Sequence, residues 1–354
     1  MKPATPRPEL GEIQPYAAPQ PPARVRLNTN ESPHSPPAEV VEEILSAARD
    51  LELNRYPDSD ATELFRALAD HLGTSLESLW IANGSNEILL HLFLAFGGPG
   101  RTCLTFEPTY SLHSTIPRLA GTSLVKAERT ENFVVDVEAA VALVREAGPD
   151  IVMLCSPNNP SGGVEPLGTT ELLLQETPGL VVVDEAYIDF ADKGDSALRM
   201  LDRYENLVVV RTFSKAWRLA SMRLGYMVAD PRVAGEMSRV RLPYHLAGVT
   251  QAAGRAVLEH IDAMAKSIEA IRKERDRLVP ELGALGATVY PSKANFILFR
   301  VDDATRVWNA LLDKGVLVRN YSGHRLLRGC LRVTVGLPEE NDAFVSAIQE
   351  VLDG

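Results

Sequence analysis

The 354-residue sequence contains few cysteines and no long apolar run. Its three cysteines, Cys103, Cys155 and Cys330, lack Cys-x-x-Cys spacing, which predicts buried thiols in a reducing cytoplasm rather than disulfides. No uninterrupted apolar stretch approaches the roughly 18 residues that indicate a membrane span. The N-terminus also lacks the apolar segment of a secretory signal. We therefore expect a cytoplasmic protein with no membrane partner.

The motifs of several other protein classes are missing as well. A nucleotide-binding oxidoreductase needs Gly-x-Gly-x-x-Gly after a strand, and the turn Gly97-Gly-Pro-Gly100 has proline in place of that geometry. Neither the Gly-Lys-Ser/Thr of phosphate-loop enzymes nor the Gly-x-Ser-x-Gly of serine hydrolases occurs. The seven histidines are scattered, so we expect no metal site. A net charge of −11 argues against a nucleic-acid partner, because phosphate backbones demand clustered Lys and Arg.

The chain divides into three regions by composition and pattern. Ten of the 24 prolines fall within residues 1–37, which predicts an extended arm rather than a packed helix. Residues 38–247 alternate between strand-like and helical segments, which predicts an α/β domain whose mostly parallel sheet is covered on both faces. Residues 248–354 predict a smaller α+β domain.

Two helices can be placed in more detail. Asp60-Ala-Thr-Glu63 is similar to a capping box, and it predicts that a helix over residues 64–72 begins there. Residues 250–282 predict one long, charged amphipathic helix that bends around Pro280.

Polar side chains follow three short apolar runs. The run 151–155 leads to Asn159, the run 180–183 leads to Asp184, and the run 207–210 leads to Lys215. Continuous apolar runs of this length are typical of parallel strands that are buried on both faces. Open α/β sheets bind ligands at the carboxyl ends of their strands. The sequence therefore predicts a site at that edge, where the three side chains meet.

Lys215 is the candidate nucleophile of this edge. A lysine forms an imine with an aldehyde only as a free amine, and its unperturbed pKa of about 10.4 opposes that state at neutral pH. Burial and cationic neighbours both disfavour the ammonium form. Lys215 follows a strand-like segment, and Arg223 lies eight residues further along the chain. These features favour a lysine that holds an aldehyde cofactor.

The remaining parts match what pyridoxal phosphate requires, namely a lysine for its aldehyde and an acid against its pyridine nitrogen. Asp184 is the candidate acid, and Asn159 and Tyr187 are candidates to bond the phenolic oxygen of the ring. The segment 80–94 reads as strand, turn and helix, so its turn presents backbone N–H groups to an anion. The residues expected to hold the phosphate are Ser85, Asn86, Ser214 and Arg223.

These motifs give the chain a family resemblance. Ser-Pro-Asn-Asn-Pro-Ser-Gly (156–162), Asp-Glu-Ala-Tyr (184–187) and the block at 214–223 resemble the signatures of fold-type-I aminotransferases. The segments 27–33, 55–58 and 330–336 more closely resemble those of histidinol-phosphate aminotransferases. The similarity covers nearly the whole chain. It implies a large domain with a mostly parallel seven-stranded sheet flanked by helices, plus the small C-terminal domain.

The resemblance also implies a role for each matched residue. Lys215 carries the cofactor and shuttles the substrate proton, while Tyr110 stacks on the cofactor ring. Tyr56 reaches the cofactor phosphate of the neighbouring subunit, so that the functional unit is a homodimer. The substrate-binding residues implied in this way are Tyr16, Asn28, Arg319 and Arg332. Among them, Arg332 binds an α-carboxylate, and Tyr16 and Arg319 face the far end of the substrate.

The reaction implied is transamination between histidinol phosphate and 2-oxoglutarate, which yields imidazole-acetol phosphate and glutamate in histidine biosynthesis. Aromatic aminotransferases and a threonine-phosphate decarboxylase share this pattern, and both remain alternatives, as does a binding protein that kept the fold without catalysis. Two positions depart from the family: Ser221 stands where glycine is usual, and Asn86 often corresponds to aspartate. Asn86 keeps its backbone donor, whereas Ser221 adds a side chain near the expected phosphate site.

Overall fold

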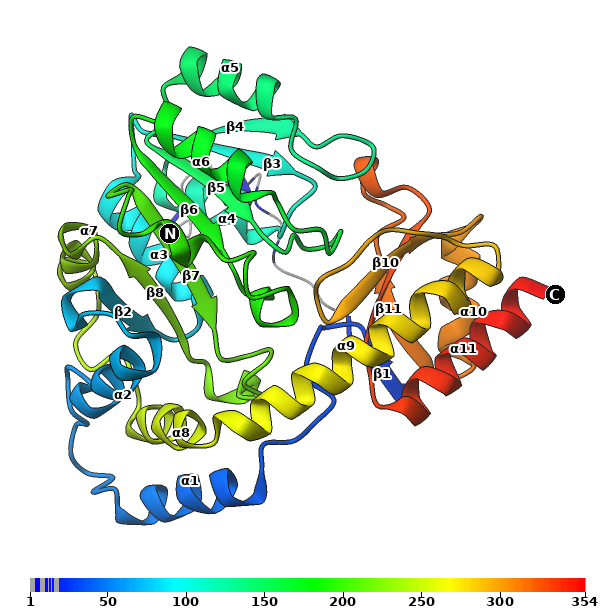
Figure 1. Ribbon diagram of the computed structural model, residues 1–354, viewed down its shortest axis with the longest axis horizontal. Helices are drawn as coiled ribbons and strands as arrows, with labels where there is room; N and C mark the ends of the chain where they lie inside the picture. The colour runs from blue at the N-terminus through cyan, green and yellow to red at the C-terminus, as the bar shows by residue number, and fades with distance from the viewer. Residues whose placement is uncertain (1–3, 7–9, 12, 14, 16–18, 354) are drawn as a thin grey trace.

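The computed structural model describes residues 4–6, 10–11, 13, 15 and 19–353, and its chain is built around two β-sheets (Figure 1). The larger sheet has seven strands, in which β8 pairs antiparallel with both of its neighbours and the other pairings are parallel. In spatial order, its strands are β2 (Leu79–Ala82), β8 (Gly225–Ala229), β7 (Leu207–Thr212), β6 (Leu180–Asp184), β5 (Ile151–Cys155), β3 (Thr102–Glu107) and β4 (Ser123–Glu128).

Helices cover both faces of this sheet. On one face lie α3 (Ser85–Phe96), α4 (Leu112–Ala120) and α7 (Pro231–Glu236), and on the other lie α5 (Val137–Ala147) and α6 (Leu167–Glu176). The strand β6 shows why its run is apolar throughout. Val182 packs in the first of these cores, while Val181 and Val183 pack in the second. The predicted parallel sheet, buried on both sides, is confirmed.

The smaller sheet carries the C-terminal part of the chain. Its spatial order is β1 (Val25–Leu27), β11 (Val316–Asn320), β12 (Cys330–Thr334), β10 (Phe296–Arg300) and β9 (Thr288–Val289). The helices α10 (Ala304–Asp313) and α11 (Pro338–Asp353) belong to this part (Figure 1). The edge strand β1 pairs in parallel with β11, so the proline-rich segment contributes a strand to a sheet nearly 300 residues away in sequence. The limits at residues 37 and 247 stay predictions.

One helix prediction is wrong. Residues 250–282 do not form one helix that bends at proline. The helical conformation is interrupted at His260, between α8 (Gly248–Glu259) and α9 (Ile261–Ala284). Pro280 lies inside α9, which continues past it. Packing explains the break: α8 lies against α1 (Ala38–Asp50) and α2 (Thr62–Leu72), whereas α9 runs across to the smaller sheet (Figure 1).

The expected capping box is also wrong. The helix α2 begins at Thr62, and the carboxylate that bonds its first turn belongs to Asp58, which accepts from the Thr62 N–H at 2.8 Å. Asp60 instead pairs with Arg241 at 2.7 Å. Ala61, with φ 48° in the left-handed region, occupies the N-cap position that the capping box assigns to Asp60. Short 3-10 helices lie at Leu76–Ser78, Ile188–Phe190, Ala197–Met200, Ala220–Met222, Met237–Arg239 and Arg325–Leu327.

Candidate active site

A cavity of about 400 Å³ opens at the carboxyl ends of the central strands. It extends from the ends of β5, β6 and β7 to the smaller sheet, so both sheets contribute to its wall. Twelve of the residues predicted for the site line it: Asn28, Ser85, Asn86, Tyr110, Asn159, Asp184, Tyr187, Ser214, Lys215, Arg223, Arg319 and Arg332. The structure thus brings together side chains from segments far apart in sequence.

Lys215 enters the cavity from the turn after β7. Its Nζ donates to the backbone carbonyl of Thr29 at 3.0 Å. Burial of the amine, followed by the nearby charges of Arg332 and Arg223, lowers the pKa of Lys215 to about 8, against the opposing effect of Glu31. The free amine is therefore far more accessible near neutral pH than it is for a lysine in water.

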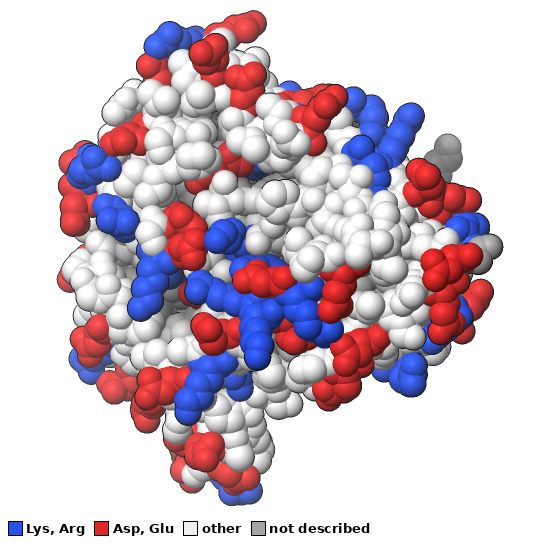
Figure 2. Space-filling view, turned by 45° about the vertical axis from the view of Figure 1, so that its right-hand side comes forward, with Lys and Arg blue, Asp and Glu red and all other residues white. Residues whose placement is uncertain are grey.

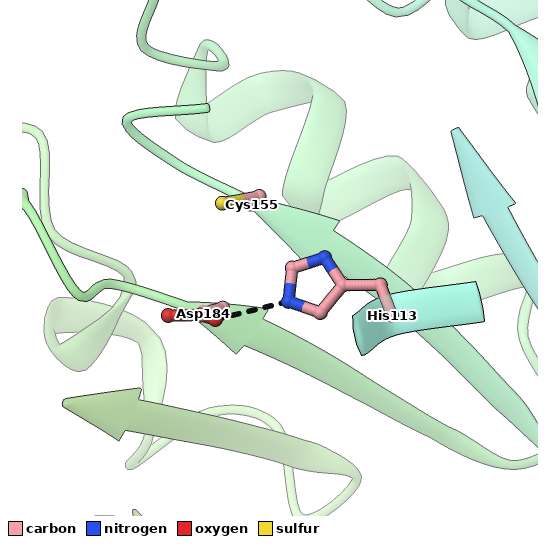
Figure 3. A group of neighbouring side chains, drawn as sticks. All are labelled: His113, Cys155 and Asp184. Carbon is pink, nitrogen blue, oxygen red and sulfur yellow. Dashed lines mark hydrogen bonds and ion pairs between the residues drawn. The ribbon is translucent and has the colours of Figure 1, made fainter. Parts of the chain in front are cut away.

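Asp184, at the end of β6, is supported from behind by a histidine that the sequence analysis did not single out. His113 Nε2 lies 2.9 Å from Asp184 Oδ2 (Figure 3). Its Nδ1 lies 3.1 Å from the Thr109 hydroxyl. An ionised carboxylate only accepts hydrogen bonds, so the pairing requires the proton on Nε2. His113 thereby fixes the direction of the Asp184 carboxylate. In the sequence, the only hint of this role is that Thr109 and His113 are four residues apart, a spacing that places two side chains close together on a helix.

Cys155 completes a group that resembles a metal site, since its ligand atom and those of His113 and Asp184 lie within 4.8 Å of one another (Figure 3). Its chemistry argues against that use. Metals bind the thiolate, and burial raises the pKa of the Cys155 thiol far above its usual range. Both nitrogens of His113 already have hydrogen-bonding partners. The group is better understood as the support of one carboxylate.

Tyr187 and Asn159 stand side by side in the cavity wall. Asn159 Nδ2 donates to the Tyr187 hydroxyl at 3.2 Å, and Asn30 Nδ2 donates to the same oxygen at 3.0 Å. Burial raises the pKa of the Tyr187 phenol, so that it keeps its proton. Asn30 was not among the predicted site residues.

Arg332, on β12, is buried, and within the described residues its guanidinium donates hydrogen bonds only to uncharged oxygens. Its NH2 donates to the Asn28 carbonyl at 3.0 Å, and its NH1 donates to Asn159 Oδ1 at 2.5 Å and to the Tyr321 hydroxyl at 2.9 Å. Within the described residues its Nε is buried and has no acceptor. A buried guanidinium of this kind is suited to bind an anionic ligand.

A second positive region lies where α3 begins. Gly84 has φ 84°, and a Cβ there would stand 2.8 Å from the Arg223 guanidinium. A Cβ at Gly225 would stand 2.5 Å from the Ser85 backbone nitrogen. The missing side chains therefore let Arg223 approach the N-terminus of α3, where backbone donors attract anions. Arg223 NH1 also lies 3.3 Å from Ser214 Oγ, which it can reach as a donor.

The other predicted residues differ in how the structure places them. Asn86 Nδ2 donates to the Tyr110 hydroxyl at 3.4 Å, and Arg319 lies over the ring of Tyr321 at 5.8 Å. Ser221 is exposed and does not line the cavity. Tyr56 is also absent from the cavity wall, and Tyr16 lies outside the described residues.

The molecular surface mixes both signs of charge. Figure 2 shows a group of Lys and Arg side chains near the middle of one face, closely flanked by Asp and Glu. No helix in the described part of the chain is both long and apolar enough to cross a bilayer.

Comparisons with known proteins agree with this geometry. Residues 23–348 match the family of class I and II aminotransferases. The chain is 48% identical over 348 residues to the histidinol-phosphate aminotransferase of Thermobifida fusca (97% of this chain, 94% of that protein). It is 47% identical over 358 residues to the enzyme of that name from Streptomyces avermitilis (98% and 96%).

Solved structures show the same architecture. The histidinol-phosphate aminotransferase of Sinorhizobium meliloti, crystallised in complex with pyridoxal 5′-phosphate, matches with a TM-score of 0.89 at 26% identity (98% of this chain, 97% of that chain). A mutant of Thermus thermophilus aspartate aminotransferase shares the fold at 24% identity, with a TM-score of 0.84 (98% and 99%). The predicted fold-type-I architecture is confirmed. The chain belongs to the class I and II aminotransferases and, within them, to the histidinol-phosphate aminotransferase family.

Proposed function

We propose that this enzyme transfers an amino group between histidinol phosphate and 2-oxoglutarate with pyridoxal 5′-phosphate as cofactor, as a step of histidine biosynthesis. The relatives that share nearly half of its residues over almost the whole chain are named histidinol-phosphate aminotransferase. The observation that carries the proposal is the cavity itself, in which a lysine with a lowered pKa faces a buried carboxylate and two separate cationic sites.

The residues of the cavity fit pyridoxal phosphate. Lys215 supplies an amine of suitable pKa, and Asp184 supplies a carboxylate held at a fixed angle by His113. Arg223, which lies close to Gly84 at the start of α3, supplies a cation beside a helix N-terminus, an arrangement that suits a phosphate. Ser85, Asn86 and Ser214 line the cavity with these groups, as does the aromatic ring of Tyr110.

When bound, pyridoxal phosphate supplies an aldehyde for the amino group and a ring that accepts the electron pair released at the substrate Cα. The chain moves and holds the protons. Lys215 Nζ, as a free amine, would take the proton from Cα and deliver it to C4′, the cofactor carbon that carries the aldehyde. The Asp184 carboxylate would pair with the pyridine nitrogen, and its negative charge would keep that nitrogen protonated. Asn159 and Tyr187 are placed to bond the phenolic oxygen.

The two arginines of the smaller sheet suit the two substrates. Glutamate has a carboxylate beside its amine, which Arg332 can bind in place of the neutral oxygens that meet it now. Histidinol phosphate has no carboxylate there. Its phosphate and the far carboxylate of glutamate both suit Arg319, which lies opposite Arg332 on the neighbouring strand β11 and lines the same cavity.

Substrate preference can be tested by half-reactions. Purified holoenzyme is mixed with histidinol phosphate, histidinol or aromatic amino acids, and the cofactor spectrum is followed. We expect histidinol phosphate to react with the highest kcat/KM and unphosphorylated histidinol to react poorly. A preference for aromatic amino acids would favour an aromatic aminotransferase, and CO2 release from a phosphorylated amino acid would favour a decarboxylase.

Arg319→Ala tests the phosphate site directly. It should lower kcat/KM for histidinol phosphate. The loss should correspond to about 2 to 4 kcal/mol of transition-state stabilisation, the scale of a lost charged hydrogen-bonding partner. Arg325→Ala is the matched control, because Arg325 also lies in the smaller domain but is exposed and paired with Glu128. Equal losses in both variants would contradict the assignment.

We further propose a cytoplasmic homodimer in which Tyr56 serves the partner's cofactor site. Tyr56 is 78% exposed and stacks on Tyr244 with ring centroids 4.3 Å apart. Leu53 and Leu242, close to these tyrosines in sequence, are 89% and 75% exposed, as expected of a surface that a second subunit covers. The three cysteines are buried free thiols, which suits the reducing cytoplasm.

Subunit mixing tests the shared site. Inactive Lys215→Ala subunits mixed with a severely impaired Tyr56→Ala variant should form some heterodimers with one intact site. Activity should therefore return after subunit exchange, and mixtures of each variant with itself serve as controls. Verified exchange without any recovery would contradict the role of Tyr56 across the interface.

A further inference from the structure

The hydroxyl of Tyr187 accepts hydrogen bonds from two side-chain amides. Asn159 donates to it at 3.2 Å from the larger domain, and Asn30 donates to it at 3.0 Å from the segment that follows β1. A phenol oxygen has two acceptor positions and one proton. With both positions filled, the hydroxyl proton is the only group that Tyr187 still has to offer.

The neighbours of Tyr187 restrict where its hydroxyl proton can be donated. Asn159 presents its amide nitrogen to Tyr187 because its Oδ1 accepts from Arg332 NH1. The Tyr187 ring cannot turn freely, since it packs edge-on against Phe296 with centroids 5.0 Å apart. Tyr187 lines the cavity, so a ligand bound there is within reach of its O–H as an acceptor.

The orientation of the Asn30 amide is fixed by Thr334 on β12. Thr334 Oγ1 accepts from the Asn30 backbone N–H at 3.0 Å and donates to Asn30 Oδ1 at 3.2 Å. The amide oxygen is thereby held on the Thr334 side, and the amide nitrogen faces Tyr187. Asn295 Nδ2 also donates to the Asn30 carbonyl at 3.1 Å. Asn30 has φ 56°, a left-handed conformation that asparagine tolerates better than most residues.

We propose that Asn30, oriented by Thr334, is a positioning residue that directs the Tyr187 proton to the phenolic oxygen of the cofactor. This inference rests on the proposed function, because it requires pyridoxal phosphate in the cavity. Asn30 itself acts only through Tyr187. Thr334, which orients the amide, belongs to β12, so the smaller sheet helps to set the chemistry of a tyrosine in the larger domain.

The surroundings of Tyr187 support its use as a donor. Burial raises the pKa of the phenol, and Arg332 and then the Asn30 hydrogen bond oppose that shift without removing it. The other titratable groups that face it are Cys155 and Tyr110, with Lys215 Nζ at 5.8 Å from the ring centroid. The phenol therefore remains protonated at neutral pH.

The test uses the pH titration of the visible absorbance of the bound cofactor in holoenzyme. A hydrogen bond from Tyr187 withdraws negative charge from the phenolic oxygen and so disfavours the protonated chromophore. Asn30→Gly, chosen because glycine accepts the positive φ, should raise the titration midpoint by about half to one pH unit, the equivalent of one ordinary hydrogen bond.

Thr334 supplies the matched pair. Thr334→Val removes the hydroxyl with little change of shape and should raise the midpoint by a smaller amount, because the Asn30 amide loses its fixed orientation. Thr334→Ser keeps the hydroxyl and should titrate like the wild type. A merely structural role of Thr334 would not separate these two variants in this way.

A double-mutant cycle with Tyr187→Phe completes the test. If Asn30 acts through Tyr187, adding Asn30→Gly to Tyr187→Phe should leave the midpoint where Tyr187→Phe alone puts it. Unchanged midpoints in Asn30→Gly and Thr334→Val, or full additivity in the cycle, would overturn the inference alone. A wild-type protein that gains no visible band with pyridoxal phosphate would overturn the proposed function and this inference together.

Discussion

Asp184 and Glu185 are neighbours at the end of β6, yet they belong to two different kinds of polar cluster. Asp184 lines the cavity, where His113 is the side chain that bonds it. Glu185 does not line the cavity. Its carboxylate accepts from Arg211 at 2.9 Å, from Ser196 Oγ at 2.9 Å and from the Ala197 N–H at 2.6 Å.

The arginines of the two clusters differ in the same way. Arg211 meets the carboxylate of Glu185, so its charge is compensated inside the protein. Arg332 meets the oxygens of Asn28, Asn159 and Tyr321, none of which carries a charge. A buried charge with a counter-charge is complete without a ligand, whereas one without it favours binding of an anion. This difference predicts that Arg332 binds a ligand and that Arg211 stabilises the fold.

The largest effect that this comparison predicts is in turnover. Lys215→Ala should reduce transamination by about 10⁴-fold, the upper end of what general acid–base transfer by a placed side chain contributes. Steady-state and single-turnover rates measure the loss. Lys293→Ala is the control, since Lys293 is exposed and paired with Asp192. Borohydride labelling of a peptide that lacks Lys215 would refute the assignment.

Substitutions of the two adjacent acids should affect different properties, stability for Glu185 and turnover for Asp184. Glu185→Gln leaves Arg211 without its counter-charge and should reduce the free energy of unfolding by about 3 kcal/mol or more, while folded molecules retain most of their kcat. Asp184→Asn should lower kcat by roughly a hundredfold, the scale of one lost electrostatic partner, with a smaller change in stability. Denaturant unfolding and kcat per folded molecule measure both. The comparison fails if the two variants behave alike.

The last of these effects is on the pH dependence of stability. The pKa of Lys215 is about 8 in the folded protein, below its ordinary value of 10.5, so the buried ammonium opposes folding fully below pH 8. This cost disappears as the pH rises to 10.5. The stability advantage of apo Lys215→Met over the wild type should therefore shrink by roughly 3 kcal/mol between pH 7 and pH 10.5. A constant difference across that range would contradict it.

The sequence predicts the part of the site in which polar side chains follow successive apolar strands. The apolar runs that lead to Asn159, Asp184 and Lys215 proved to be β5, β6 and β7, and parallel pairing places their ends together. Local spacing is enough for this inference, because the direction of parallel strands is shared.

What the sequence does not predict are partners chosen by tertiary packing. Asn30 bonds Tyr187 from 157 residues away, and His113 bonds Asp184 across 71 residues. Asn30 lies in the family-like segment 27–33 and His113 lies four residues after Thr109, but neither local pattern identifies the distant partner. The break at His260 has the same origin, since the periodicity of α8 and α9 is continuous although the two helices pack on different partners.

The edge strand β1 has a consequence for handling the protein. It covers the open side of β11, whose backbone groups opposite Val25–Leu27 are paired only as long as the N-terminal segment is present. A chain shortened to begin at α1 would leave that row of donors and acceptors bare, and bare sheet edges recruit strands from other molecules. Such a truncation should therefore give a protein prone to aggregate through the smaller domain, in addition to one that lacks the carbonyls facing Lys215 and Arg332.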